Sequence, residues 1–555
     1  MFSRRVVLSF LSIFVGYSIF CLYGLSLRFG FGFPTEVYWL SFVFVSIPLL
    51  FEAVFWKSSP KLRLFYLLSF SLMISLQYAV VDSSAFLSSE DAVADYRLTD
   101  RIISDGQWTP LESVEWGFGS EYRFHPVTNF IYATLSLLTE IPLILVVKYL
   151  FVIRAFVITP IAQRLFKNFF SQKVAYLATI IFLASPGAIL FPHKEAFAVI
   201  FFIIGLYVVT KTEKTRQYLL LGIVSIFTLI MTHHFTTYIF LILLTALFLA
   251  NKFYGTKKTV RISSQFYILS LVVFVTWVTV IAWSIVAQHQ RVLFSILFQN
   301  LFSGSLTFAE LLPLYAPYES IIVWLGYGIT LLSAGFGLLV FIRNKKSLSS
   351  SFFALILVLL PILVLATLIR FLPVGFSIGM AHRAYEFGYL IVGALSSLFV
   401  IGAIKLSNKS SLKIVLIGAV LVMILLGPMA SATYPRTFAR VSNIISEKSM
   451  STSVWMNSSG AATEYTIGDR FVRIIVSGYG DSLTLEYPEI YPSPDFSIPL
   501  DLGHKISYVI THKYVTDFYG PNADKFYTSP YLNNLYSNGM LTVFSVTNQS
   551  LFLGP

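Results

Sequence analysis

The chain has 555 residues, of which 56% are hydrophobic and 12% are charged, and this composition excludes an ordinary soluble globular protein. A net charge of +12 can indicate nucleic-acid binding, but here the basic residues gather in short loops between hydrophobic runs, where they set membrane orientation and contact anionic headgroups. The only cysteine, Cys21, lies inside a hydrophobic run, so neither a disulfide nor a thiolate metal site is expected.

Thirteen hydrophobic runs are candidates for membrane-spanning helices, since a span needs roughly 20 mostly apolar residues. The first follows Arg4 and Arg5, and because no small-residue cleavage site comes after Leu27, we interpret it as a retained helix and not as a signal peptide. The predicted spans lie near 6–27, 36–56, 62–81, 142–164, 174–190, 195–211, 217–232, 235–251, 265–288, 320–342, 351–372, 384–405 and 412–433.

Charged residues separate onto two faces of the predicted bundle. Lysine and arginine clusters follow every second span, and the positive-inside rule places them in the cytoplasm together with the N-terminus. An odd number of spans then places the C-terminal segment outside the cell membrane. Acids, histidines and isolated cations gather at the opposite span ends, near 90–95, 125, 193–195, 233–234 and 382–383. This asymmetry indicates that the outer face carries the chemistry.

A long polar segment, 82–128, follows the third predicted span on the outer face. The spacing of its apolar residues predicts a short amphipathic helix on the membrane surface, which ends at Gly106. Asp91 and Asp95 are four residues apart and therefore share one face of that helix. On spacing alone a second interpretation is equally good: Ser88 and Asp91 fit a capping box, in which the carboxylate only satisfies a backbone amide.

From about residue 434 the hydrophobic runs shorten and polar residues become frequent. The sequence therefore predicts two domains: a transmembrane catalytic domain, 1–433, which includes the outer loop, and a small extracytoplasmic α/β domain, 434–555. Within the second domain we expect a helix at 437–455, strands at 471–477 and 507–511, and a helix end followed by a strand at 533–547. The turn in this last segment is expected at Asn538-Gly539.

Short motifs along most of the chain resemble those of the GT-C superfamily, the multispan glycosyltransferases that use polyprenyl-phosphate-linked sugars. Archaeal members carry a pattern like D-x-x-x-E-Y in the first outer loop, followed by an isoleucine and G-x-W; here Asp95 replaces the more usual Glu. The matching residues of the loop are Asp91, Asp95, Tyr96, Ile102, Gly106 and Trp108. Further similar segments are 122–126, 232–238, 382–387, Trp455, 468–469 and 535–539.

The resemblance implies an α-helical polytopic membrane protein of about thirteen transmembrane helices with a GT-C-like fold. It also implies an inverting glycosyltransferase, which transfers a sugar from a dolichyl or undecaprenyl phosphate donor to a glycan, lipid or protein acceptor on the outer face. In this reading Asp91 is the general base that takes the proton of the acceptor hydroxyl. Glu90 or Asp95 would orient the acceptor or share a divalent ion with Asp91, and His233 would assist them.

The departing phosphate needs cations at the headgroup level. For each candidate, the alternative is that a long side chain merely reaches the membrane interface. The candidates for the donor phosphate are Lys194 and Arg383 first, and Arg123, His125 and His233 as additions.

The sequence does not decide whether the protein uses a metal cofactor. For a divalent cation such as Mg²⁺ or Mn²⁺, the weak candidate ligands are Asp91 and His233. His233 and His234 are adjacent on a predicted helix and point about 100° apart, so joint ligation of one ion is disfavoured.

Two other functions fit part of the pattern. Thirteen spans and an outer tail also resemble the oligosaccharyltransferase catalytic subunit, which, like a polysaccharide ligase, would use a lipid pyrophosphate donor; its tail signature WWDYG is absent here. A transporter or flippase for a polar lipid usually places ionisable residues near the bilayer midplane in repeated halves, and no repeat is visible in this sequence. The composition suits a prokaryotic, archaeal-type pathway of surface glycans.

Overall fold

The structure is a computed structural model of the whole chain. It describes residues 4–29, 33–55, 58–81, 87, 90–108, 123–185, 194–211, 216–254, 262–283, 287, 317–343, 350–370, 375–406, 410–430, 447–459, 465–468, 472, 475–476, 483–486, 506–512, 525–530, 532–538 and 540–547. The chain divides into two units. The first, the membrane unit, comprises Met1–Val81 and Tyr149–Arg436. The second comprises Asp82–Lys148 and Thr437–Pro555, and we call it the outer unit because the sequence predicts most of it on the outer face of the membrane. The predicted domain boundary at 433 stays a prediction.

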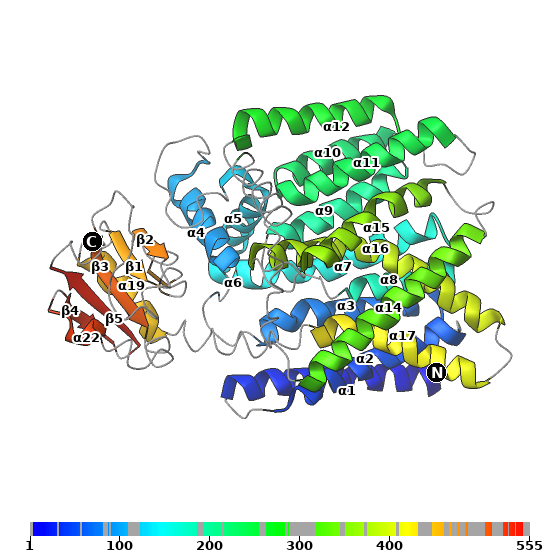
Figure 1. The fold of residues 1–555 in the computed structure, drawn as a ribbon, viewed down its shortest axis with the longest axis horizontal. Coiled ribbons are helices and arrows are strands. Elements are labelled where there is room, and N and C mark those ends of the chain that lie inside the picture. The colour runs from blue at the N-terminus through cyan, green and yellow to red at the C-terminus, as the bar shows by residue number, and fades with distance from the viewer. Residues whose placement is uncertain are drawn as a thin grey trace, which may run out of the picture. The chain divides into compact units, whose positions relative to one another are not determined.

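A helix lies at each of the thirteen predicted spans (Figure 1). Among the described residues, seven helical stretches are long and apolar enough to cross a membrane: Arg4–Leu27, Thr35–Ala53, Leu143–Lys167, His234–Phe253, Ser264–Ala282, Trp324–Arg343 and Glu386–Leu406. The fold is therefore that of an α-helical multi-pass membrane protein, whereas the number of spans and the orientation of the termini stay predictions.

The first helices are α1 (Arg4–Phe29), α2 (Thr35–Phe55), α3 (Pro60–Val81), α6 (Leu143–Tyr149), the 3₁₀ turn η2 (Leu150–Val152) and α7 (Ile153–Lys167). They are followed by α8 (Gln172–Leu183), α9 (Lys194–Val209), α10 (Arg216–Ile230), α11 (His234–Tyr254), α12 (Ser264–Trp277) and the π-helical turn η3 (Val278–Ala282). The last are α14 (Pro317–Arg343), α15 (Ser350–Arg370), α16 (Gly375–Leu406) and α17 (Ser410–Ala430).

Glycines let the helices around α16 approach one another closely. A Cβ added at Gly393 of α16 would lie 2.8 Å from the carbonyl oxygen of Ala178 on α8. Gly337 of α14 faces the backbone of Leu395 on α16 at even closer range. Since lipid tails are as apolar as leucine, such close packing of small residues is a main source of helix association in membranes. It fixes α16, which carries part of the candidate site.

The outer unit begins with α4 (Glu90–Asp105), which packs against α5 (Val127–Thr139). The amphipathic helix predicted from the sequence is thus confirmed, and it is followed by Gly106 in the left-handed conformation, with φ of 67°. With 13 residues, α5 is only about 20 Å long, too short to cross the hydrocarbon core by itself.

The tail of the outer unit contains a mixed five-stranded sheet in the order β2-β1-β3-β5-β4. The strands are β1 (Tyr465–Gly468), β2 (Leu483–Glu486), β3 (Ile506–His512), β4 (Leu532–Ser537) and β5 (Leu541–Val546). β1 is parallel to β2 and β3, whereas β5 is antiparallel to β3 and β4. Two short helices, α19 (Glu447–Ser458) and α22 (Lys525–Thr528), complete the described part of the tail.

The helix α19 packs against the β4–β5 hairpin through residues of two motifs named above, Trp455 and the segment 535–539. Trp455 stacks on Tyr536, with ring centroids 4.9 Å apart. The amide of Asn538 donates hydrogen bonds to the hydroxyls of Ser451 at 3.0 Å and Thr452 at 2.9 Å. The same residue also holds the turn, because its Oδ1 accepts hydrogen bonds from the backbone N–H groups of Met540 and Leu541. Two of the tail motifs, Trp455 and 535–539, therefore serve one packing site.

Two predictions for the tail are wrong, and the other predictions that fall on described residues are confirmed. The expected strand at 471–477 is helical at its described residues, Val472, Ile475 and Val476. The expected helix end after 533 is the strand β4, because its partner β5 imposes the extended conformation across the turn. The strand at 507–511 is present as β3, Asn538 does form the turn, and the strand expected after the turn is present as β5. The helix expected at 437–455 is present from Glu447 on as α19. The parts of the predicted helix 437–455 before Glu447 lie outside the described residues.

Substitution of Gly393 by alanine is expected to weaken the membrane unit, because the new methyl group must push α16 away from α8. Overpacking of this kind typically costs about 1–3 kcal/mol, which would appear as a lower unfolding temperature of the purified protein in detergent. The matched control is Gly402→Ala in the same helix, where a Cβ would meet nothing within 4 Å. Equal unfolding temperatures for the two variants would contradict this packing.

Candidate active site

Asp91 and Asp95 occupy successive turns of α4 but lie in different environments. Asp95 is fully buried, with 0% of its surface exposed. Asp91, one turn closer to the start of the helix, is only partly buried. The sequence predicts that the two carboxylates share one face of the helix. In the structure the first of them, Asp91, is partly accessible, whereas the second, Asp95, is enclosed. Only the first of the two keeps exposed surface at which an acceptor molecule can be met.

Asp95 is held by a buried polar network between α4 and α5. The Nδ2 of Asn129 donates to the backbone oxygen of Asp95 at 3.0 Å, to its Oδ1 at 3.3 Å and to Oγ1 of Thr99 at 3.0 Å. Because an amide nitrogen carries only two hydrogens, these three acceptors share them. Thr99 in turn donates to the backbone oxygen of Asp95 at 2.6 Å. The buried Tyr132 of α5 has its pKa raised by burial and by the charge of Asp95.

Trp108 connects the end of α4 to the segment before α5. Its Nε1 donates to the carbonyl oxygen of Arg123 at 2.8 Å, and its ring meets Phe130 of α5 edge-on, with centroids 5.9 Å apart. Leu98 and Ile102 of α4 complete this apolar cluster. The tryptophan of the loop motif therefore fixes the position of α4 relative to α5.

Arg123 and His125 lie directly before α5. The guanidinium of Arg123 lies over the ring of Phe124, 4.9 Å from its centroid, and partial burial lowers its pKa. His125 is buried, with 5% of its surface exposed. Both predicted phosphate ligands thus belong to the outer unit, together with Asp91.

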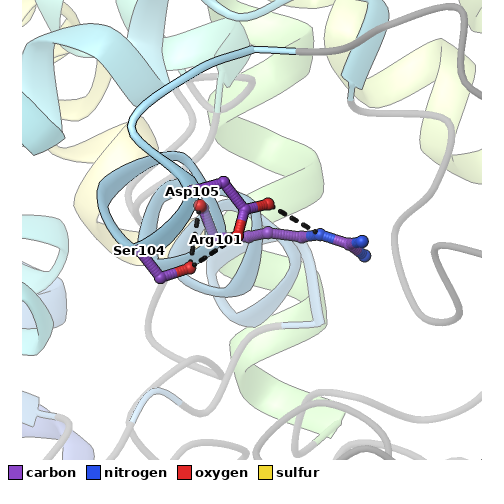
Figure 2. A network of polar contacts seen from close by, with 3 residues as sticks. All are labelled: Arg101, Ser104 and Asp105. Atoms are coloured by element: carbon purple, nitrogen blue, oxygen red, sulfur yellow. Dashed lines mark hydrogen bonds and ion pairs between the residues drawn. The ribbon is translucent and has the colours of Figure 1, made fainter.

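The far end of α4 is polar and exposed. Figure 2 shows Arg101 reaching Asp105, with Nε 3.3 Å from Oδ2, while Ser104 donates to the carbonyl oxygen of Arg101 at 3.0 Å. Both charged side chains are more than a third exposed, so solvent screens the pair and it contributes little stability. Asp105 therefore provides a control for substitutions of Asp91 and Asn129.

A second group of charged residues lies inside the membrane unit. Lys194 and Glu195 begin α9 and are buried, at 2% and 0% exposure. Glu386 of α16 is also buried and forms an ion pair with Arg154 of α7. Glu195 acts electrostatically on the same guanidinium. We call Arg154, Lys194, Glu195 and Glu386 the buried charge cluster.

Aromatic packing positions the cluster. Phe387, the residue after Glu386, contacts Phe202 of α9 and Phe235 of α11, at centroid distances of 4.8 Å and 6.4 Å. Along α9, Lys194 lies about 22 Å from the opposite helix end at Val209, given a rise of 1.5 Å per residue. The cluster is thus remote from the basic loops near 211 and 405.

His233 has a structural role that the sequence analysis did not assign. It precedes α11, and its Nδ1 accepts a hydrogen bond from the backbone N–H of Thr236 at 3.4 Å and lies 2.9 Å from the Thr236 hydroxyl. This arrangement satisfies one of the N–H groups at the helix start. The His233 ring lies 5.2 Å from that of His234. Because Nδ1 is engaged with Thr236, His233 would have to contact a substrate or a metal ion through its Nε2.

Some predicted site residues lie beyond what can be described. Glu90 and Arg383 belong to α4 and α16, but the placement of their side chains falls outside the described residues, as does Ser88 of the predicted capping box. Among the described residues, no group of three or more histidine, cysteine, aspartate or glutamate side chains is arranged to hold a metal ion. The metal candidates Asp91 and His233 stay predictions.

The sequence analysis missed Arg154 and Asn129. Arg154 stands in the apolar run 150–161, and an arginine inside a predicted span is a functional candidate by default, so this signal was present in the sequence. Lys148, also buried, carries the same signal. Asn129 gave no comparable signal, because its importance depends on the packing of α5 against α4.

Comparison with known proteins supports the fold. No protein-family model matches the sequence, and no curated protein matches it. The chain is similar to the apo oligosaccharyltransferase of Archaeoglobus fulgidus, with 12% identity, a TM-score of 0.52, and coverage of 85% of this chain and 73% of that one. It is also similar to AglB from Archaeoglobus fulgidus, solved with an inhibitory peptide and a dolichol-phosphate, with 13% identity, a TM-score of 0.52, and coverage of 88% and 75%.

A third similar structure is that of ArnT from Cupriavidus metallidurans bound to undecaprenyl phosphate, with 10% identity and a TM-score of 0.50. The alignment covers 90% of this chain and 100% of that one. At such identities the likeness shows the fold. The GT-C-like fold that the sequence motifs predict is thereby confirmed.

Replacement of Asn129 by alanine is expected to destabilise the outer unit, because it removes the donor that Asp95 and Thr99 share. Leaving a buried polar group without such a partner costs about 1–3 kcal/mol. The measurement is the loss of protection against backbone hydrogen exchange in α4 and α5. Asp105→Asn, which breaks only the exposed pair with Arg101, should change protection by less than the equivalent of about 0.5 kcal/mol. Similar protection in both variants would show that the network does not hold α4.

Proposed function

We propose that this protein is a membrane glycosyltransferase that transfers a sugar from a polyprenyl phosphate donor to an acceptor hydroxyl or amide on the outer face of the membrane. The observation that carries the proposal is the buried charge cluster in a fold whose solved relatives include one bound to dolichol-phosphate and one bound to undecaprenyl phosphate. A protein that handles a phosphorylated lipid needs cations inside an apolar bundle, and Lys194 and Arg154 are such cations.

The bonds that break and form during transfer indicate the remaining roles. The bond between the anomeric carbon and the phosphate oxygen breaks, a bond from the acceptor atom to that carbon forms, and the acceptor proton must leave. Attack from the side opposite the phosphate inverts the anomeric centre. The phosphate begins as a diester with one negative charge and gains a second as it departs, so cations stabilise the transition state more than the ground state.

Asp91 is the proposed general base. A base needs a carboxylate that an acceptor can reach within hydrogen-bond distance. The partly exposed Asp91 meets this requirement better than Asp95, which is enclosed and bonded to Asn129. Asp95 then stabilises the α4–α5 pair that carries Asp91, and it has an indirect role in orienting the acceptor. Glu90 remains a candidate for direct acceptor contact.

Lys194 is the proposed primary ligand of the donor phosphate. Its ammonium group is buried at the start of α9, where the helix dipole adds positive potential for an anion. Arg383 comes three residues before Glu386 in the sequence of α16 and is a further candidate. Arg123 and His125 are secondary candidates in the outer unit.

An oligosaccharyltransferase with a pyrophosphate donor is the second candidate. The likeness to two oligosaccharyltransferase structures favours it. Against it, the sequence lacks the WWDYG signature, and the alignment with ArnT covers that whole chain. The donor headgroup therefore distinguishes the two.

The variant Asp91→Asn is expected to lower the rate of sugar transfer by roughly 10²- to 10⁴-fold, because the amide cannot accept the acceptor proton. The measurement is transfer of labelled sugar from polyprenyl phosphate in membranes that contain the variant at the wild-type level. Asp105→Asn in the same helix should keep the wild-type rate. Near-normal transfer by Asp91→Asn would remove this residue from the mechanism.

Membranes containing the wild-type protein are expected to consume a sugar linked to undecaprenyl or dolichyl monophosphate and to leave the matching pyrophosphate donor intact. The physical reason is that Glu195 and Glu386 offset the two cations of the buried charge cluster, so little net positive charge remains there for a second phosphate group. Thin-layer separation of the labelled lipids measures both. Consumption of the pyrophosphate donor alone would favour the oligosaccharyltransferase.

A further inference from the structure

The turn between α5 and α6, residues 136–145, presents apolar side chains on the outside of the protein. Leu137 and Leu138 at the end of α5 keep 64% and 76% of their surface exposed, and Ile141 and Leu145 beyond the turn keep 45% and 40%. Glu140 is the only charged residue in this segment. Single exposed leucines are common on soluble proteins, but several in one turn indicate a surface that meets another apolar phase.

The distribution of side chains along α5 is the reverse of that in a water-facing helix. The first half of the helix buries Thr128, Asn129 and Tyr132, of which Asn129 is hydrogen-bonded to α4. The last turns expose Leu137 and Leu138. In water an amphipathic helix buries its leucines and exposes its polar groups. The end of α5 therefore has the surface of a helix that faces lipid.

The backbone polar groups of the turn are bonded within the turn itself. Ser136 donates through its hydroxyl to the carbonyl oxygen of Ile141 at 2.8 Å, and Thr139 donates to that of Leu135 at 2.6 Å. The hydroxyl oxygen of Thr139 accepts from the backbone N–H of Ile141 at 3.5 Å. The next residue, Pro142, has no N–H group. Such internal bonding is what a backbone needs where no water is present to bond it.

The connection to the following helix places the turn near a membrane boundary. The candidate span Leu143–Lys167 begins directly after Pro142. Five residues separate Leu138 from Leu143, and they reach at most about 18 Å even when fully extended. The exposed carboxylate of Glu140 limits how deeply the turn can enter hydrocarbon, because an ionised group there is costly. These features match a segment that is immersed to the depth of the upper acyl chains.

We infer that the turn 136–145 is a membrane anchor, which buries Leu137, Leu138, Ile141 and Leu145 among the acyl chains of the bilayer. Lipid is a better occupant of this surface than another protein, because protein interfaces carry a polar rim with hydrogen bonds, whereas this turn uses its hydroxyls for its own backbone.

The anchor has a consequence for the proposed function, on which this second step rests. Since α5 packs against α4, an anchored α5 sets the depth at which α4 presents Asp91. The α5–α6 turn would thus hold the general base at the level of the lipid headgroups, where a phosphate-linked sugar is found.

Fluorescence quenching in liposomes tests the anchor without any assay of activity. Because Cys21 is the only cysteine, a Cys21→Ser background accepts a single NBD label at Leu138→Cys in the purified full-length protein. We expect this label to lose fluorescence with doxyl-labelled phosphatidylcholine and to resist aqueous iodide. The matched control is Ser104→Cys at the exposed end of α4, whose label should be quenched by iodide.

The two other outcomes of this experiment would overturn the inference. Quenching of the Leu138 label by iodide alone would place the turn in water. Protection of the label from both quenchers would show that a protein surface covers the turn, and intermolecular contact with a second copy would then be the explanation.

The consequence for Asp91 is tested by removing the anchor. The double variant Leu137→Ser with Leu138→Ser is expected to lower sugar transfer roughly 10- to 100-fold, because small displacements of a reacting group have effects of this size. The matched control is Leu220→Ser with Leu221→Ser, an exposed leucine pair on α10, which should keep the wild-type rate. Equal rates in the two double variants would remove the link between the anchor and Asp91. Absence of transfer by the wild-type protein would contradict the proposed function, while the quenching result would still decide the anchor.

Discussion

The structure depends on one constraint: an ionised group inside an apolar helix bundle must be compensated by another charge or a polar partner. The membrane unit meets it through the ion pair between Arg154 of α7 and Glu386 of α16, with Glu195 acting on the same guanidinium. The outer unit meets it through Asn129, which bonds the enclosed Asp95. Because each compensating partner comes from a different helix, the charges also determine which helices must pack together.

The same constraint separates two kinds of carboxylate. An enclosed carboxylate is held by the protein itself: Asp95 accepts a hydrogen bond from Asn129, and Glu386 forms an ion pair with Arg154. A carboxylate with exposed surface, such as Asp91, can exchange a partner with an incoming molecule. Identical side chains four residues apart on α4 therefore take different roles, and neither role follows from the residue type alone.

Hydrophobic length and helical period were sufficient to predict the helices of the membrane unit and α4, since these depend on patterns of neighbouring residues, from 12 in α8 to 32 in α16. They were not sufficient for the tail. β1 and β2 are four residues long and β4 has the composition of a turn-rich segment, so their conformation is imposed by pairing with strands distant in sequence. The candidate site divides in the same way: Asp91 and Lys194 are proposed from motifs and span ends, whereas the role of Asn129 depends on the packing of α5 on α4.

Arg154 shows that a physical rule can be more informative than a motif at low sequence identity. It belongs to none of the short segments that resemble the GT-C superfamily, yet a lone arginine in the run 150–161 already signals a buried charge that needs a partner. The partner, Glu386, lies more than two hundred residues away and within the motif segment 382–387. The ion pair thus connects that motif to α7, and it gives the acidic residue of the motif a definite task, which is to hold a cation in place within an apolar surrounding.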